Sequence, residues 1–361
     1  MGQMSSQRIR YLQTSDKVRV AWAEAGSGPA VVKASNWLTH LEYEWESPVW
    51  SHWMRFFAGH FRFVRYDERG CGMTDWNVGD LSFERRIGDL EAIVDAAGLR
   101  GRFTLLGISQ GGALCVAYAA RHPEQVERLI LYGVYAQGWA RRGEPEHARE
   151  YDAIINLIRA GWGRDNPAFR SVFTSRFIPD GTDEQLAWFN DLCRKTATPG
   201  NAAEVLGSRS QVDVSDLLPT ITAPTLVLHA REDAVTPISQ GRLVASLIPG
   251  AQFVELDSKN HILLEHEPAW KRFTEAVLEF MGMPARMAED PAFEALSPRE
   301  REILALISEG LGNADIGERL SISEKTVRNH VSNLFDKLGV WTRAQAIVFA
   351  RDRGFTEQRH T

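Results

Sequence analysis

Cysteine is scarce in this chain, and no apolar run in it is long. Its 361 residues include three cysteines, none spaced as in a zinc site or a redox pair, so we expect free thiols in a cytoplasmic protein. No apolar run reaches the ~18–20 residues that span a bilayer, and residues 1–10 lack the apolar stretch of a signal peptide. Metal-ligand spacing and nucleotide or flavin motifs are also missing. We therefore expect no membrane partner, no metal and no cofactor.

An excess of positive charge is missing as well. The formal net charge is −6, which excludes binding to nucleic acid through a globally basic surface. Residues 292–361 hold 10 Lys plus Arg against 10 Asp plus Glu, so the acidic excess lies before them. Any contact with nucleic acid must come from a local patch.

Short apolar runs alternate with helix-like segments in most of the chain. Strands are expected at residues 30–32, 61–66, 103–107, 129–133, 225–228 and 252–256, and helices at 83–97, 111–121 and 268–281. This alternation predicts a parallel sheet covered by helices on both faces. Active sites of such sheets lie at the carboxyl ends of strands, so the turns there hold the candidate residues.

One such turn reads Gly-Ile-Ser-Gln-Gly-Gly at residues 107–112. Glycines on either side of Ser109 permit a tight strand-to-helix turn that lifts the hydroxyl above the sheet. The next backbone N–H is then free to hold an oxyanion. The alternative is an ordinary glycine turn with a helix-capping serine. Because an apolar strand precedes the turn and a helical segment follows it, we favour the nucleophile elbow.

A nucleophilic serine needs a base, and the base needs an orienting acid. Asp233 and His261 each follow an expected strand, in the order that serine hydrolases with such a sheet use. Glu232 is a rival acid, and His229 and His266 are rival bases at less suitable positions. The alternative for His261 is that it merely satisfies the hydrogen bonds of a loop.

Residues 15–281 resemble the α/β-hydrolase family. Besides the elbow, the sequence Asp-Glu-Arg-Gly-Cys-Gly at residues 67–72 matches a turn common in that family. The resemblance implies that Ser109, Asp233 and His261 form a catalytic triad.

The same resemblance implies that the backbone N–H groups of Trp37 and Gln110 form an oxyanion hole. Where the family usually has a His-Gly pair, this chain has Ser-Asn-Trp at residues 35–37. Because the glycine is missing, we expect a different loop conformation, and efficient turnover is a weaker expectation than the triad.

An aromatic-rich, helical insertion at residues 137–218 resembles the cap that roofs the pocket in this family. We expect a small apolar ligand, an ester or a lactone, in a pocket between the cap and the sheet. The alternative is that each aromatic side chain only packs the cap against the sheet. The candidate pocket residues are Asn36, Trp37, Trp139, Trp162, Phe169, Phe173, Phe177 and Trp188.

A proline-containing stretch at residues 283–294 is expected to be a linker. After it, residues 297–300 form a capping box with proline at the first helical position. Further helices are expected at 314–320, 323–338 and 343–353. The chain is thus predicted to have an α/β-hydrolase fold with a helical cap at residues 1–282 and an all-α, four-helix helix-turn-helix domain at 295–361.

The longest of these helices has an apolar face and a polar face. Val327, Val331, Leu334 and Leu338 recur at helical spacing and should face the core. On the polar face, Arg, Asn and Ser side chains can read base edges in a major groove, and neighbouring polar groups suit phosphate contacts. The predicted base readers are Arg328, Asn329 and Ser332, and the predicted phosphate or groove-edge contacts are Lys325, Thr326, His330 and Asn333. The alternative is a helical interaction module with a solvated polar face.

Residues 295–353 closely resemble the C-terminal domain of LuxR/FixJ/NarL-type regulators. The matching segments are residues 296–302, 313–317, 326–331 and 337–340. The resemblance implies double-stranded DNA as partner, and dimerisation through residues 343–350 onto an inverted repeat. Ser332 is a shorter reader than a basic residue, so its sequence preference is expected to differ.

The two resemblances together predict a homodimeric, ligand-responsive transcription regulator. The first domain would sense the ester or lactone, and would hydrolyse it slowly if the triad is active. The alternative is an active serine esterase or lactonase with a secondary DNA-binding domain. A third hypothesis, that the hydrolase fold only provides a dimer surface, has no support in the sequence.

Overall fold

A computed structural model describes residues 6–283 and 295–352, together with Phe293 and Phe355. It divides into two compact units, with the boundary after Met283. Apart from Met283 and Phe293, the predicted linker lies outside the described residues. Within the described part of the chain, no helix is both long and apolar enough to cross a membrane.

The first unit is built on an eight-stranded sheet in the order β1-β2-β4-β3-β5-β6-β7-β8. The strands are β1 (Arg8–Gln13), β2 (Arg19–Ala25), β3 (Ala30–Lys33), β4 (Arg62–Tyr66), β5 (Phe103–Ile108), β6 (Val126–Tyr132), β7 (Thr225–Ala230) and β8 (Gln252–Leu256). The parallel sheet is confirmed from β4 to β8. The prediction missed β1 and β2, which pair antiparallel with each other and place β2 antiparallel to β4.

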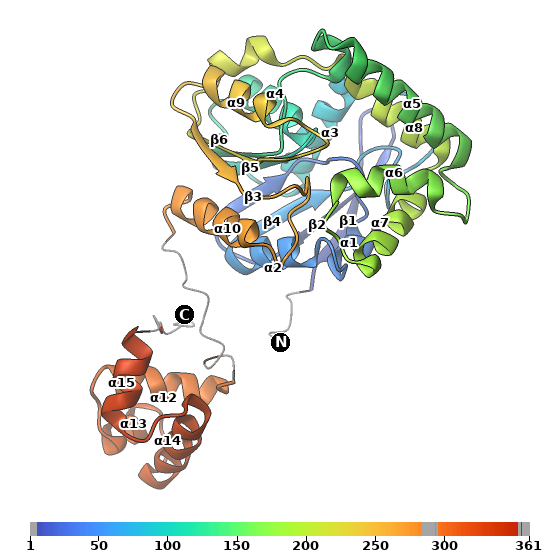
Figure 1. The fold of residues 1–361 in the computed structure, drawn as a ribbon. Coiled ribbons are helices and arrows are strands. Elements are labelled where there is room, and N and C mark those ends of the chain that lie inside the picture. Colours follow the sequence, from blue (N-terminus) through green and yellow to red (C-terminus); the bar gives the residue numbers. More distant parts are fainter. Residues whose placement is uncertain (1–5, 284–292, 294, 353–354, 356–361) are drawn as a thin grey trace. The chain divides into compact units, whose positions relative to one another are not determined.

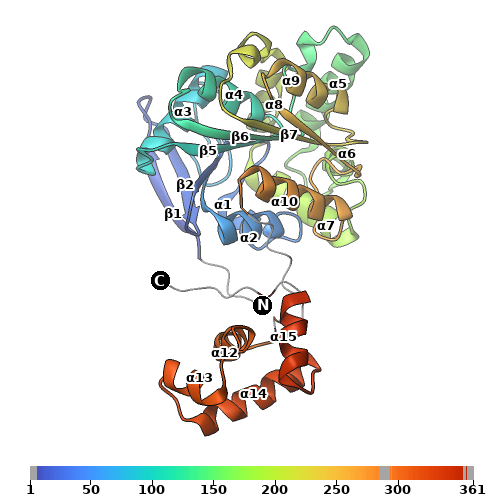
Figure 2. The same ribbon diagram turned by 90° about the vertical axis from the view of Figure 1, so that its left-hand side faces the viewer.

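Helices cover both faces of this sheet (Figures 1 and 2). One face carries α1 (Leu41–Trp45), α2 (Ser51–His60) and α10 (Pro268–Phe280), and the other carries α3 (Phe83–Ala96), α4 (Gly111–Arg121) and α9 (Ile238–Leu247). Every residue of the central strand β5 is buried, as expected for a parallel strand covered on both sides. The rigid sheet therefore fixes the turns at its strand ends.

The cap lies between β6 and β7. Its helices are α5 (Pro145–Gly161), α6 (Ala168–Phe177), α7 (Asp183–Thr196) and α8 (Pro199–Ser208), which gather on one side of the unit (Figure 1). An isolated β-bridge between Gln137 and Asp213 joins the start and the end of this insertion. The cap is thus one continuous insertion between two neighbouring strands of the sheet.

The second unit contains α12 (Pro298–Ser308), α13 (Asn313–Arg319), α14 (Glu324–Leu338) and α15 (Arg343–Asp352). The predicted capping box at Ser297 and Glu300 is confirmed, with both reciprocal hydrogen bonds present. On α14, the four predicted apolar positions from residue 327 to residue 338 are buried in the core of this unit. Gly339 ends α14 with φ 65°, a conformation that glycine adopts without steric cost.

Candidate functional site

The turn between β5 and α4 is strained and tightly packed. Ser109 has φ 52°, a conformation rare for residues with a side chain and typical of functional turns. A Cβ on Gly107 would lie 2.6 Å from the Cα of Gly112, and a Cβ on Gly112 would lie 2.3 Å from a methyl carbon of Val134. The Ser109 hydroxyl does not cap α4, whose N-cap is Gln110. This geometry favours a nucleophile elbow over a capping turn.

Asp233 and His261 lie together at the ends of β7 and β8. Asp233 Oδ2 is 2.6 Å from His261 Nδ1, and Asp233 Oδ1 accepts hydrogen bonds from the backbone N–H groups of Val235 and Thr236. Burial acts to raise the pKa of Asp233, but the neighbouring His261, His229 and these hydrogen bonds outweigh it, so the pKa is lowered. Asp233 is therefore held as a carboxylate that orients the imidazole.

Ser109 Oγ and His261 Nε2 are both buried and have no hydrogen-bond partner among the described residues. No hydrogen bond joins these two atoms. Of the rivals, Glu232 and His266 are exposed. His229 is buried beside Asp233, with Nε2 3.7 Å from Oδ2, but this nitrogen lies closer to the carbonyl oxygen of Thr236, at 2.8 Å. His261 is thus the histidine placed at bonding distance from Asp233.

The loop after β3 carries the predicted oxyanion-hole residue Trp37. Its backbone N–H donates to Gln110 Oε1 at 3.1 Å. The carboxamide oxygen of Gln110 therefore occupies the donor that an oxyanion would need. The Trp37 ring is buried against Trp162 and Phe173 of the cap, at centroid distances of 5.9 and 6.0 Å.

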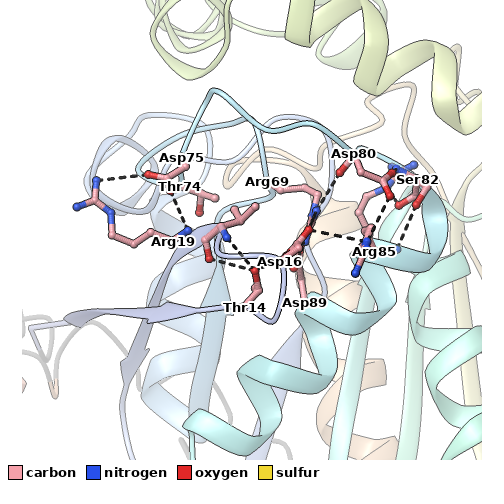
Figure 3. Close-up of polar contacts among 12 residues, drawn as sticks. Thr14, Asp16, Arg19, Arg69, Thr74, Asp75, Asp80, Ser82, Arg85 and Asp89 are labelled. Atoms are coloured by element: carbon pink, nitrogen blue, oxygen red, sulfur yellow. Dashed lines mark hydrogen bonds and ion pairs between the residues drawn. The ribbon is translucent and has the colours of Figure 1, made fainter.

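The turn at residues 67–72 supports this region through buried charges. Asp67 Oδ2 accepts hydrogen bonds from the backbone N–H groups of Leu41 and Met73. Arg69 donates to both carboxylate oxygens of Asp89 and pairs with Asp16 at 2.9 Å (Figure 3). Arg69 and Glu68 are thus both in buried ion pairs, which indicates a structural role for this turn.

A narrow, partly open cavity lies between Gln110 of the elbow and the cap. Three of the candidate pocket residues, Trp139, Phe173 and Phe177, line it. The ring of Phe177 also packs edge-on against His261, with centroids 5.2 Å apart. The other lining residues are Gln110, Tyr135, Arg142, Tyr151, Ile154, Arg176, Leu206, Val235 and Thr236.

The remaining candidate pocket residues do not line this cavity. Asn36 is buried, where its carboxamide oxygen accepts from Lys33 Nζ and its NH₂ group donates to the Trp37 carbonyl. Trp37 and Trp162 pack behind the wall. Phe169 is half-buried at the start of α6, under the Arg164 guanidinium.

Sequence reasoning missed the arginines and tyrosines of the cavity wall. Within the cap it considered only tryptophan and phenylalanine side chains as pocket residues. The one available signal was Arg142, three residues after Trp139 in the same segment. Whether these arginines and tyrosines face a cavity depends on how α5 and α6 pack.

The polar face of α14 is the candidate DNA interface. Lys325, Arg328, Asn329, Ser332 and Asn333 are exposed, and Thr326 and His330 are half-buried. Arg328 pairs with Glu324 at 2.9 Å, one turn earlier on the same helix. All seven predicted contact residues thus belong to one helix, opposite its buried apolar stripe.

Comparison with known proteins identifies both units. A family model described as alpha/beta hydrolase fold matches residues 43–268, and one described as bacterial regulatory proteins, luxR family, matches residues 294–350. Over 257 residues the chain is 26% identical to the AB hydrolase superfamily protein YisY of Bacillus subtilis, covering 70% of this chain and 91% of that protein. Over 244 residues it is 29% identical to the pyrrolizixenacetamide deacetylase of Xenorhabdus hominickii, covering 66% and 86%.

A solved structure agrees with these matches. The enol-lactonase from Burkholderia xenovorans LB400 is similar at a TM-score of 0.60 and 26% identity, covering 76% of this chain and all of that one. These matches confirm the predicted fold class and the fusion of two domains. The chain belongs to the α/β hydrolase fold family and carries a luxR-family DNA-binding domain after its hydrolase domain.

Proposed function

We propose that this protein is a cytoplasmic, ligand-responsive transcription regulator whose hydrolase domain binds, and slowly hydrolyses, a small ester or lactone. The observation that carries the proposal is that one chain has both a luxR-family DNA-binding domain and a capped cavity beside a strained serine elbow. Ligand binding would regulate DNA binding through its different affinity for two states of the protein.

DNA binding would use the polar face of α14. Arg328 can donate two hydrogen bonds to a guanine and Asn329 can pair with an adenine, while the neighbouring polar residues hold phosphates. Arg328 would first leave Glu324, and an exposed ion pair of this kind contributes little to stability. A homodimer formed through α15 would then bind an inverted repeat.

Hydrolysis would follow the serine-hydrolase scheme. Ser109 Oγ attacks the ester carbonyl carbon, His261 Nε2 takes the hydroxyl proton, and Asp233 stabilises the imidazolium that forms. The alcohol then leaves with the proton from His261, and a water molecule deprotonated by the same histidine attacks the acyl-serine to release the acid and restore Ser109. The developing oxyanion would accept hydrogen bonds from the backbone N–H groups of Trp37 and Gln110. Because the Gln110 side chain occupies the Trp37 donor, it must move first, which supports slow turnover.

A second function, that of an esterase or lactonase with a secondary DNA-binding domain, is favoured by the Asp233–His261 pair next to the elbow. A receptor has no need for these side chains together with Ser109. The relatives include an enol-lactonase and a deacetylase by their names, which agrees with acyl transfer to water as the chemistry.

A reporter gene behind a promoter that the protein binds separates the two functions. The sensor function predicts that Arg328→Ala abolishes the response, while Ser109→Ala preserves or prolongs it. Exposed residues of the same types provide the controls, Arg100→Ala and Ser246→Ala, and both should respond like the unmodified protein. If Ser109→Ala abolishes the response, catalysis acts upstream of signalling. If no DNA sequence is bound with or without ligand, the regulator function is refuted.

A further inference from the structure

The cavity beside the elbow is lined by a guanidinium that forms no ion pair among the described residues. Arg142 lines it, with Nε donating to the Gln137 carbonyl at 2.8 Å and the guanidinium lying 5.0 Å from the centre of the Tyr135 ring. Its Nη1 is buried and has no hydrogen-bond partner among the described residues. A guanidinium stays protonated at any physiological pH, and leaving a buried cationic donor unpaired is costly. This donor is therefore suited to an anionic acceptor from a ligand.

A second guanidinium on the same wall is already paired. Arg176 Nη1 lies 2.8 Å from Glu150 and Nη2 donates to the Ala234 carbonyl at 2.9 Å. Arg176 therefore adds to the positive field without offering the free donor that Arg142 offers.

A smaller cavity adjoins the first and shares Gln110 and Tyr135 with it. Arg86 and Arg209 line this second space, and both pair with one carboxylate, that of Glu68. Two guanidiniums thus share a single negative charge. Arg209 is only 2% exposed, and its Nε and Nη1 have no partner among the described residues.

Tyr135 lines both cavities, and the arginines of each cavity affect the pKa of its phenol. Burial raises its pKa to about 12, while Arg209, Arg142 and Arg86 each act to lower it. The acidic groups that face these guanidiniums are few. Glu68 and Glu150 are in the ion pairs described above, Asp233 is held by His261, and Glu144 lies on the exposed surface near Arg142.

Much of the remaining wall is apolar. Trp139, Ile154, Phe173, Phe177 and Leu206 surround the same space, so it suits a hydrocarbon segment between a reacting carbonyl at the elbow and a charged end at Arg142. We propose that the ligand is an ester or lactone whose acid part carries a second, ionised carboxylate, and that Arg142 binds this carboxylate. This inference rests on the proposed function, and it replaces the purely apolar ligand expected from the sequence.

Calorimetric titration of the full-length Ser109→Ala protein tests this inference without turnover. The ligands are the monomethyl esters of glutaric, adipic and pimelic acid, and the controls are the dimethyl esters of the same acids, which lack the charge. We expect at least one monoester to bind tenfold or more tightly than its dimethyl ester, because charge-assisted hydrogen bonds are worth about this factor or more.

Arg142→Gln in the same background should make the two affinities equal, while Arg142→Lys should keep part of the preference. The neighbouring exposed residue provides the control Arg141→Gln, which should keep all of it. An unchanged affinity for the dimethyl ester shows that the Arg142→Gln protein is folded around its cavity. Equal affinities in the parent protein, a preference for the dimethyl ester, binding of neither series, or a preference that survives Arg142→Gln would each overturn the inference.

These measurements distinguish failure of the carboxylate site from failure of the proposed sensor function. A protein that prefers the monoester, but whose DNA affinity ignores it, retains the carboxylate site and loses the sensor function. A protein whose DNA affinity responds to the neutral dimethyl ester without preference for the monoester retains the sensor function and loses the carboxylate site.

Discussion

Replacing Asp233 by asparagine changes the charge of the site while keeping its shape. In the structure, Asp233 Oδ1 accepts two backbone hydrogen bonds and Oδ2 faces His261 Nδ1 at 2.6 Å. Asparagine would keep its oxygen on the two backbone donors and turn its NH₂ group toward Nδ1. The imidazole would then carry its proton on Nε2, where it cannot accept the proton of Ser109.

The size of the effect follows from this tautomer. The same substitution in the triad of a serine protease lowers kcat by about 10⁴-fold, which corresponds to about 5.5 kcal/mol of transition-state stabilisation. We expect a similar loss of kcat for p-nitrophenyl butyrate, measured under saturating substrate. The matched control is Asp257→Asn, because this aspartate follows the neighbouring strand β8 but its side chain is 83% exposed. A loss below about tenfold would refute the assignment of Asp233 as the orienting acid.

The same variant has a predicted pH signature. The folded pKa of Asp233 lies below the ordinary value of 3.8, so its charge stabilises the folded state above about pH 4 and this contribution is lost as the pH falls through the folded pKa. In urea unfolding, the Asp233→Asn protein should be less stable than the parent at neutral pH, and the difference should shrink on acidification. A difference that grows as the pH falls would contradict this sign.

Three further predictions concern other parts of the chain. Gln110→Ala frees the Trp37 N–H from its competing acceptor, so ester hydrolysis should rise by about 2–10-fold, the value of one hydrogen bond; an unchanged or lower kcat would show that the side chain does not obstruct the hole. Glu68→Gln leaves Arg86 and Arg209 without their carboxylate, so urea unfolding of the hydrolase domain should show a loss of about 3–5 kcal/mol, whereas the exposed control Glu46→Gln should change it little; equal stability of the two variants would contradict the buried network. Ser297→Ala removes the capping box of α12 and should cost the second domain about 1 kcal/mol, measured by its thermal unfolding; no change would mean that the box is not formed in solution.

The sequence predicted the elements and the Asp233–His261 pair because both depend on local rules. Apolar periodicity defines β5 and α4, and the carboxyl ends of β7 and β8 must lie side by side in a parallel sheet. The edge hairpin of β1 and β2 was missed, although Arg8–Gln13 alternates in part between charged and apolar residues. The sequence pattern there was short, and the strand is largely exposed.

The wall of the cavity could not be predicted because it depends on side-chain directions and long-range packing. Gln110 Oε1 accepts from a backbone group 73 positions earlier in the chain, and Arg209 meets Glu68 from 141 positions away. Phe169 has the helical spacing of Phe173 and Phe177, yet it packs against Gly161 instead of lining the cavity. Residue spacing shows which side chains share a face of a helix, but it does not show which part of the protein packs against that face.

The most direct test of the proposed function is the affinity of the Ser109→Ala protein for its operator, selected from random DNA, with and without a saturating ester ligand. Fluorescence anisotropy at fixed salt concentration measures this affinity. Coupling between the cavity and α14 predicts a change of about fivefold or more in Kd, the lower end for allosteric proteins. An operator Kd that stays the same while calorimetry shows the cavity to be occupied would contradict the proposal that the hydrolase domain acts as the sensor.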